Sequence, residues 1–240
     1  MKTLTKLTAI FILLITTTSC FIDGFNGIKG NGSVQSEDRK ISSNFETIKV
    51  QQGINLYLTQ GSKTDLSVEA DENIIDLLIT EVKNNELKVY FEKNVYRAKA
   101  RNVYLTAKQI SGIYTSSGAS VKSENTLNVQ TLDLDSSSGS SIKIHVNADD
   151  VTSETSSGAN MDLFGKTNTF SARASSGSSI DADELVAEVA YANASSGANI
   201  DVNVTEKLTA KASSGGDIDY EGNPTDINKN TSSGGSVSRS

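Results

Sequence analysis

The tripeptide Ser-Ser-Gly occurs seven times after residue 115 of this 240-residue chain, and an apolar residue always stands three positions after the glycine. The seven glycines are Gly118, Gly139, Gly158, Gly177, Gly197, Gly215 and Gly234. Their successive spacings are 18 to 21 residues. A repeat of about twenty residues with one strand and one turn is typical of solenoids. Each repeat is therefore predicted to form one coil of a stack.

The residues after each glycine alternate between apolar and polar. Three positions after it stand Val121, Ile142, Met161, Ile180, Ile200, Ile218 and Val237. Five positions after it, most are apolar again: Ile144, Leu163, Ala182, Val202 and Tyr220. The position between is always polar: Lys122, Lys143, Asp162, Asp181, Asp201, Asp219 and Ser238. This alternation predicts a strand with one buried face and one exposed face.

The residues before each glycine predict a narrow interior. Three positions before it, the side chain is always small: Thr115, Ser136, Thr155, Ala174, Ala194, Ala212 and Thr231. Seven positions before it, a larger one is common: Leu132, Val151, Phe170, Leu208 and Ile227. The chain has no Trp and only 6% aromatic residues, which suits a thin core. We therefore predict an all-β fold, a parallel β-helix or β-solenoid of about seven short coils over residues 111–240, with coils roughly 4.8 Å apart.

The Ser-Ser-Gly motif is interpreted as a structural corner, because glycine adopts the left-handed conformation without steric cost. We expect the serines to stack as two ladders and their hydroxyls to bond to backbone groups at the bend. A valine at Gly177 should also press on the glycines stacked above and below. Gly177→Val should therefore lose more stability than Thr167→Val, because Thr167 is expected in an exposed loop. The alternatives are an array of nucleophiles or a flat face for ice or a polysaccharide lattice. His145, the only histidine, should be a solvated surface residue.

Four aspartates, Asp162, Asp181, Asp201 and Asp219, share one position of the repeat and should form a column. Like charges about 5 Å apart repel. Either the side chains spread into water, which we favour, or a cation bridges them. Lys122 and Lys143 precede the aspartates in the same column and should offset the charge at one end.

Residues 44–110 are predicted to form a β-rich section that precedes the repeats. The segment from Phe45 to Gln60 alternates on both sides of Gly53, which predicts two strands and a turn. The segment VKNNELKVYF predicts a hairpin turning at Asn84 and Asn85. The intervening ENIIDLLITEV could form one or two helical turns.

The first residues predict export. Lys2 and Lys6 precede the short apolar run LTAIFILLI, as in a signal peptide over residues 1–19. Cys20, the only cysteine, stands where a bacterial lipobox has its lipidated residue, although the usual leucine three positions earlier is Thr17. Residues 20–43 are predicted to be a flexible tether. Removing residues 1–19 takes away two positive charges and changes the net charge from −7 to −9, which disfavours nucleic acid as a partner.

The blocks FETIKVQQGINLYLTQG and LSVEADENIIDLLITEVKNNELKV, followed by the Ser-Ser-Gly repeats, resemble the GIN-domain family, which is labelled as the head of autotransporter adhesins. Gly53, Ile54 and Asn55 are the residues that spell the name. The resemblance covers residues 44–235. It implies an exported or lipid-anchored all-β domain with a β-helical fold, and it supplies no catalytic or ligand-binding residues.

The expected function is an envelope-anchored, adhesin-like binding or structural module, held at the outer membrane by lipid on Cys20. The short coils favour a protein that is not an enzyme. A glycan or a protein at the cell surface is the expected ligand, and we expect no catalytic residues, metal or cofactor. The competing interpretation is a polysaccharide lyase or hydrolase, since such enzymes also use parallel β-helices. Self-assembly through the terminal coils is a third interpretation, which the polar last coil disfavours.

Overall fold

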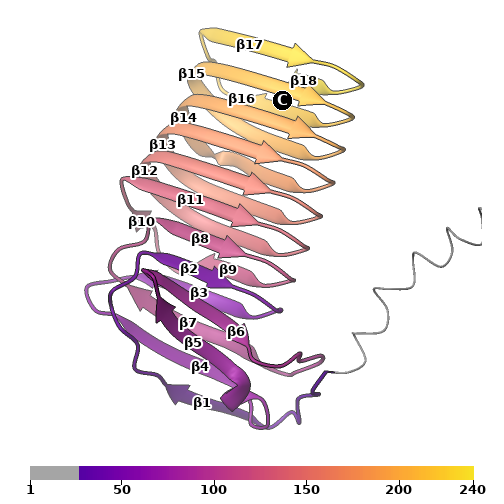
Figure 1. The fold of residues 1–240 in the computed structure, drawn as a ribbon. Helices are drawn as coiled ribbons and strands as arrows, with labels where there is room; N and C mark the ends of the chain where they lie inside the picture. The colour runs from indigo at the N-terminus through magenta and orange to yellow at the C-terminus, as the bar shows by residue number, and fades with distance from the viewer. Residues whose placement is uncertain (1–26) are drawn as a thin grey trace, which may run out of the picture.

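The repeats form pairs of parallel strands in the computed structural model, which describes residues 27–240 (Figure 1). Each coil contributes one strand to each of two faces, and strands of neighbouring coils pair in parallel. Four long strands run through both faces: β12 (Ser141–Thr155), β13 (Asn160–Ala174), β14 (Ser179–Ser195) and β15 (Asn199–Ser213). The fold is thus the predicted β-solenoid, with about seven turns in the repeats.

The two faces are here called sheet A, whose strands end at the Ser-Ser-Gly turns, and sheet B, whose strands begin after them. Sheet A contains β6 (Glu86–Phe91), β2 (Thr47–Val50), β8 (Gly112–Thr115), β11 (Thr131–Ser136), the second halves of β12 to β15, and β17 (Asp226–Thr231). Sheet B contains β7 (Arg101–Ala107), β3 (Asn55–Gln60), β9 (Ser120–Ser123), the first halves of β12 to β15, β16 (Asp217–Glu221) and β18 (Ser236–Arg239). The short β10 (Leu127–Asn128) pairs with β12 beside them.

The inward columns make one continuous core. The apolar residues three positions after the glycines are buried up to Ile218, and Val237 in the last coil is partly buried against the core. The larger residues before the glycines also stack: Leu132, Val151, Phe170 and Leu208 are buried, whereas Ile227 is exposed. Burying each large side chain contributes about 1.5–3 kcal/mol. The alternation in the sequence therefore assigns the inner and outer faces correctly.

The stack does not follow chain order at its N-terminal end. Strand β2 pairs with β6 on one side and β8 on the other, and β3 pairs likewise with β7 and β9. The coil made by β2 and β3 therefore lies between two coils that come later in the sequence. The stack runs without a break through residue 110, where the sequence interpretation divides the β-rich section from the repeats.

Antiparallel strands cap this end of the solenoid. Strand β4 (Asp65–Asp71) pairs with β7, β1 (Val34–Asp38) pairs with β4, and β5 (Leu78–Lys83) pairs with β6. The ambiguous apolar segment forms the short 3-10 helix η2 (Ile75–Leu77) and then β5. The predicted hairpin is present, with positive φ at Asn84 and Asn85.

The cap also changes the interpretation of the tether. Residues 34–38 form an ordered edge strand, so structure begins before Phe45. The side chain of Asp71 is fully buried and accepts hydrogen bonds from the backbone N–H groups of Gly32, Lys99 and Ala100, at 2.8, 2.9 and 2.9 Å. Burial alone would raise the pKa of Asp71, but these hydrogen bonds, led by the one from Ala100, lower it below its usual value. The carboxylate therefore fastens the segment before β1 to the rest of the cap.

Candidate functional site

The Ser-Ser-Gly motif is a tight turn in which both the second serine and the glycine have positive φ. At the middle turn, φ is 56° at Ser176 and 66° at Gly177. The glycine N–H donates to the carbonyl of the serine in the next coil, as from Gly177 to Ser196 at 3.1 Å. The positive φ of the glycine confirms the predicted structural corner. The hydrogen bonds that connect successive corners are made by backbone groups.

Two expectations about the corner are wrong. A Cβ atom built on Gly177 would have no heavy atom within 4 Å, so a side chain there would begin in open space and not against the stacked glycines. Thr167 is only 4% exposed, because its hydroxyl turns inward and contacts the carbonyls of Asp149 and Thr169, both at 3.0 Å. It lies within β13 at the opposite corner of the coil and is not in an exposed loop.

Buried hydroxyls line the core beneath some of the turns. Ser140, directly after a motif glycine, is 1% exposed and contacts Thr115 and Ser136 at 3.0 and 2.9 Å. Its hydroxyl also donates to the carbonyl of Ser137. The hydrogen bonds satisfy these hydroxyls inside the structure, which gives them a packing role.

The column of aspartates forms as predicted on the outer face of sheet B. Asp162, Asp181, Asp201 and Asp219 occupy paired positions on successive strands. Burial, followed by the charges of Asp181 and Asp219, raises the pKa of Asp201 to about 6. The negative charges of the column therefore repel one another, which destabilises the ionised form of Asp201.

Partners are present at both ends of this column. The Lys143 Nζ lies 3.4 Å from Asp162, and the Ser238 hydroxyl donates to Asp219 at 2.7 Å. Within residues 27–240, no group of three or more His, Cys, Asp and Glu side chains is arranged to hold a metal ion. His145 is exposed next to this column, as expected, and its ring stacks on Phe164 with centroids 4.6 Å apart.

A wide groove of about 680 Å³ crosses the outer face of sheet B at the capped end. Its floor comes from outward-facing residues of β3, β7 and β4, with Glu124 just beyond β9 at one end. Residues 38–41, at the end of β1 and after it, form the opposite wall. The groove is therefore assembled from segments far apart in the sequence, and the sequence interpretation did not identify it.

Two tyrosines stack at the centre of the groove. Tyr57 and Tyr104 pair across β3 and β7, with ring centroids 5.1 Å apart and planes inclined by 14°. The Tyr104 hydroxyl donates to Glu69 at 3.3 Å, and burial, followed by the charge of Glu69, raises the pKa of Tyr104. A signal for this pair was present in the sequence: β3 reads NLYLT and β7 reads NVYLT, so tyrosine stands at an outward position of both strands.

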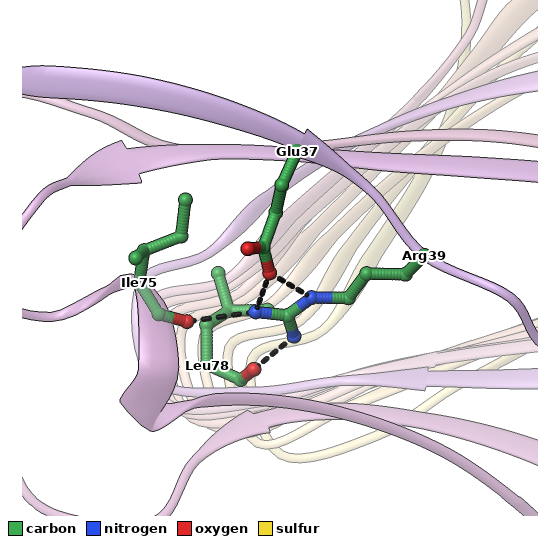
Figure 2. A network of polar contacts seen from close by, with 4 residues as sticks. All are labelled: Glu37, Arg39, Ile75 and Leu78. Atoms are coloured by element: carbon green, nitrogen blue, oxygen red, sulfur yellow. Dashed lines mark hydrogen bonds and ion pairs between the residues drawn. The ribbon is translucent and has the colours of Figure 1, made fainter.

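The wall of the groove is fixed by Arg39 (Figure 2). Its guanidinium donates to the carbonyl of Ile75 at 2.8 Å, to the carbonyl of Leu78 and to the Glu37 carboxylate at 2.6 Å. Its backbone N–H donates to the Leu66 carbonyl at 2.8 Å. These bonds tie the end of β1 to β4, η2 and β5, so the wall is held before any ligand arrives.

Most of the chain matches a known protein family. The family model described as "Putative auto-transporter adhesin, head GIN domain" matches residues 44–224. The chain belongs to this family. The match confirms the resemblance carried by Gly53 and the Ser-Ser-Gly repeats. A search of proteins with curated functions found no match.

Solved structures share the GIN-domain fold. A "putative adhesin" from Bacteroides fragilis has 24% identity and a TM-score of 0.83, covering 89% of this chain and 100% of its own. A "putative lipid binding protein" from Parabacteroides distasonis has 22% identity and a TM-score of 0.73, covering 89% and 99%. A "putative adhesin" from the same species has 18% identity and a TM-score of 0.75, with the same coverage. At these identities, the likeness shows the fold.

The predicted signal peptide and Cys20 lie outside the described residues of this GIN-domain chain. In residues 27–240, no helix combines the length and apolar character needed to span a bilayer. The described chain enters the solenoid at its capped end, far from the C-terminus (Figure 1).

Proposed function

We propose that this GIN-domain protein is an exported, adhesin-like binding module, attached to the outer membrane through lipid on Cys20. The observation that carries the proposal is the groove on sheet B, where the Tyr57 and Tyr104 rings stack and Tyr104 is exposed. Pockets with aromatic walls and a few placed polar groups are typical binding sites. The family name and the names of the structural neighbours support the same class of function.

The solenoid suits this role because it is a rigid support. Neighbouring coils of the repeat are hydrogen-bonded to each other along both sheets, and the interior is filled by side chains. An anchor at Cys20 would hold the solenoid by its capped end, since Ile28 pairs there with Val95, shortly after β6. Ligands would then meet the outer faces of the sheets.

Anchoring is tested with Cys20→Ala in cells that produce the full chain. We expect wild-type protein to take up labelled palmitate and to enter the detergent phase, and the variant to do neither. The matched control is Ser19→Ala, a substitution of similar size at the neighbouring position, and it should keep the lipid. Incorporation of palmitate by Cys20→Ala would contradict the anchor.

Binding is tested by exposing the purified protein to arrays of glycans and of surface proteins. Saturable binding to either class supports the module, and binding to neither contradicts it. The competing enzyme interpretation is tested on the same glycans by measuring new reducing ends and unsaturated products. Their appearance with time would overturn the proposal that the domain binds without catalysis.

A further inference from the structure

We propose that the groove around Tyr57 and Tyr104 binds an oligosaccharide, with one sugar ring lying against the free face of Tyr104. The inference rests on the proposed binding function and adds to it a site and a ligand class. It is carried by three features of the groove: the aromatic surface, the chemistry of its rim and the full backbone pairing of the strands in its floor.

The aromatic surface is a ring face that its own sheet leaves open. One face of Tyr104 is covered by Tyr57 of β3. On its other side runs β4, where the paired residue is Ser67, whose side chain is too small to cover a ring. Tyr104 is accordingly 44% exposed although it lies in the middle of a sheet. A flat apolar face of this kind matches the C–H face of a pyranose ring.

The rim of the groove offers short polar groups around this face. Ser67 and Thr106 provide hydroxyls beside Tyr104, and Asp65 provides a carboxylate at the start of β4. Glu124 lies at the far end, where it pairs with Lys122 at 3.1 Å. Hydroxyls can donate and accept, and carboxylates accept from sugar hydroxyls. The lining itself carries charges of both signs, which favours a ligand that is neutral overall: Asp38, Arg39, Lys40, Asp65 and Glu124.

The floor of the groove argues against an extended peptide. Strand β7 is paired with β3 on one side and β4 on the other, and β3 is paired with β7 and β9. A peptide that adds to a sheet needs an unpaired strand edge. Recognition here must therefore depend on side chains, which suits a ligand that presents hydroxyls and apolar ring faces.

The site is also organised in advance. The Asn102 side chain donates to Glu69 at 2.8 Å, and the same carboxylate accepts from the Tyr104 hydroxyl, so the ring is held in place. Arg39 holds the opposite wall (Figure 2). Prior order of this kind reduces the entropy lost on binding.

The proposal is tested with the purified protein and a panel of neutral, acidic and amino-sugar oligosaccharides, from both bacterial envelope polysaccharides and animal cell surfaces. Each oligosaccharide that binds the wild type is titrated by calorimetry against Tyr104→Ala and Tyr104→Phe. The matched control is Tyr191→Ala, because Tyr191 is 45% exposed but lies on sheet A. Thermal unfolding of every variant is recorded in parallel.

We expect Tyr104→Ala to weaken binding by about tenfold or more, Tyr104→Phe to stay within about threefold, and Tyr191→Ala to bind as the wild type. Comparable melting temperatures for the two alanine variants would separate binding from folding. If Tyr104→Ala unfolds, Ser67→Trp, which covers the free ring face from β4, must abolish binding instead.

Each outcome separates this inference from the proposed function. If wild type, Tyr104→Ala and Ser67→Trp bind an oligosaccharide equally well, the groove is not its binding site. The proposed binding function would still stand. If the protein binds only surface proteins, the proposed ligand class is wrong, and the proposed binding function again stands. Binding to no member of either array overturns both.

Discussion

The backbone N–H of Gly53 donates to the carbonyl of Ser117 at 3.0 Å, although the two residues belong to distant parts of the sequence. Gln52 and Gly53 have φ values of 60° and 66°, close to those of the serine and glycine in each Ser-Ser-Gly turn. The glycine of the family's name is therefore the first member of the same column of turns. The N-terminal section and the repeats are consequently parts of one solenoid.

Glycine is needed for different reasons in the Ser-Ser-Gly turns and at the opposite corner of the coil. Alanine substitutions at the two places should therefore differ in how much stability they remove. At Gly177, an alanine would have free space and would meet only the cost of positive φ, about 1–2 kcal/mol. At Gly165, where φ is 115°, a Cβ atom would overlap the Val146 carbonyl oxygen. We expect Gly165→Ala to lose more than about 3 kcal/mol in urea unfolding. Equal losses for the two variants would show that the backbone at Gly165 moves easily.

The repeat could be predicted because its coils follow one another and each carries its own alternation. The apolar position of a coil, such as Ile180 or Ile200, is buried for the reason that its spacing from glycine indicates. Asp162 and Asp181 could likewise be placed side by side, because equal positions of successive coils stack.

The groove could not be predicted in the same way. The insertion of β2 and β3 between later coils depends on pairing between distant strands, on which local periodicity gives no information. Strand β1 is exposed at four of its five residues, so it lacks an apolar alternation. Thr167 resembles a loop residue in sequence, yet its hydroxyl contacts two backbone carbonyls inside the corner. These features arise from tertiary contacts.

The inward column is predicted to tolerate no charge. Ile200 is 1% exposed within β15, and an aspartate there would bury a carboxylate without a partner. We expect Ile200→Asp to lose more than about 3 kcal/mol or to fail to fold. The control is Asn193→Asp on the exposed side of the neighbouring strand β14, where the paired residues are Arg173 and Lys211, and it should change stability by less than about 1 kcal/mol. A similar melting temperature for both variants would contradict the assignment of faces.

The stability of the antiparallel cap should depend strongly on the buried carboxylate of Asp71. Asp71→Ala removes the acceptor for three backbone N–H groups, two of them in the segment that leads to β7. Unpaired buried donors cost about 1–3 kcal/mol each, so we expect a loss of about 3 kcal/mol or more in urea unfolding. Asp71→Asn keeps one acceptor oxygen and should lose less. Because the pKa of Asp71 is lowered, the wild-type advantage should be present above its ordinary value of 3.8 and disappear as the pH falls further.

The aspartate column predicts the opposite pH dependence. The pKa of Asp201 is raised from 3.8 to about 6, so the folded state binds a proton more tightly than the unfolded state. The contribution of Asp201 to stability is then greatest below 3.8 and falls as the pH rises toward 6. Asp201→Asn removes this loss, and we expect it to stabilise the protein at neutral pH by on the order of 1 kcal/mol after solvent screening, with little effect in acid.

Urea unfolding at about pH 4, 5.5 and 7, which brackets the range between the ordinary and the raised pKa, measures this effect. The control is Glu206→Gln, which removes an exposed carboxylate of the same strand that lies outside the aspartate column. If the stability of Asp201→Asn ran parallel to that of the wild type across the three values, the stacked carboxylates would not repel one another. The side chains would then either spread into water or share a cation, the two arrangements that the sequence leaves open.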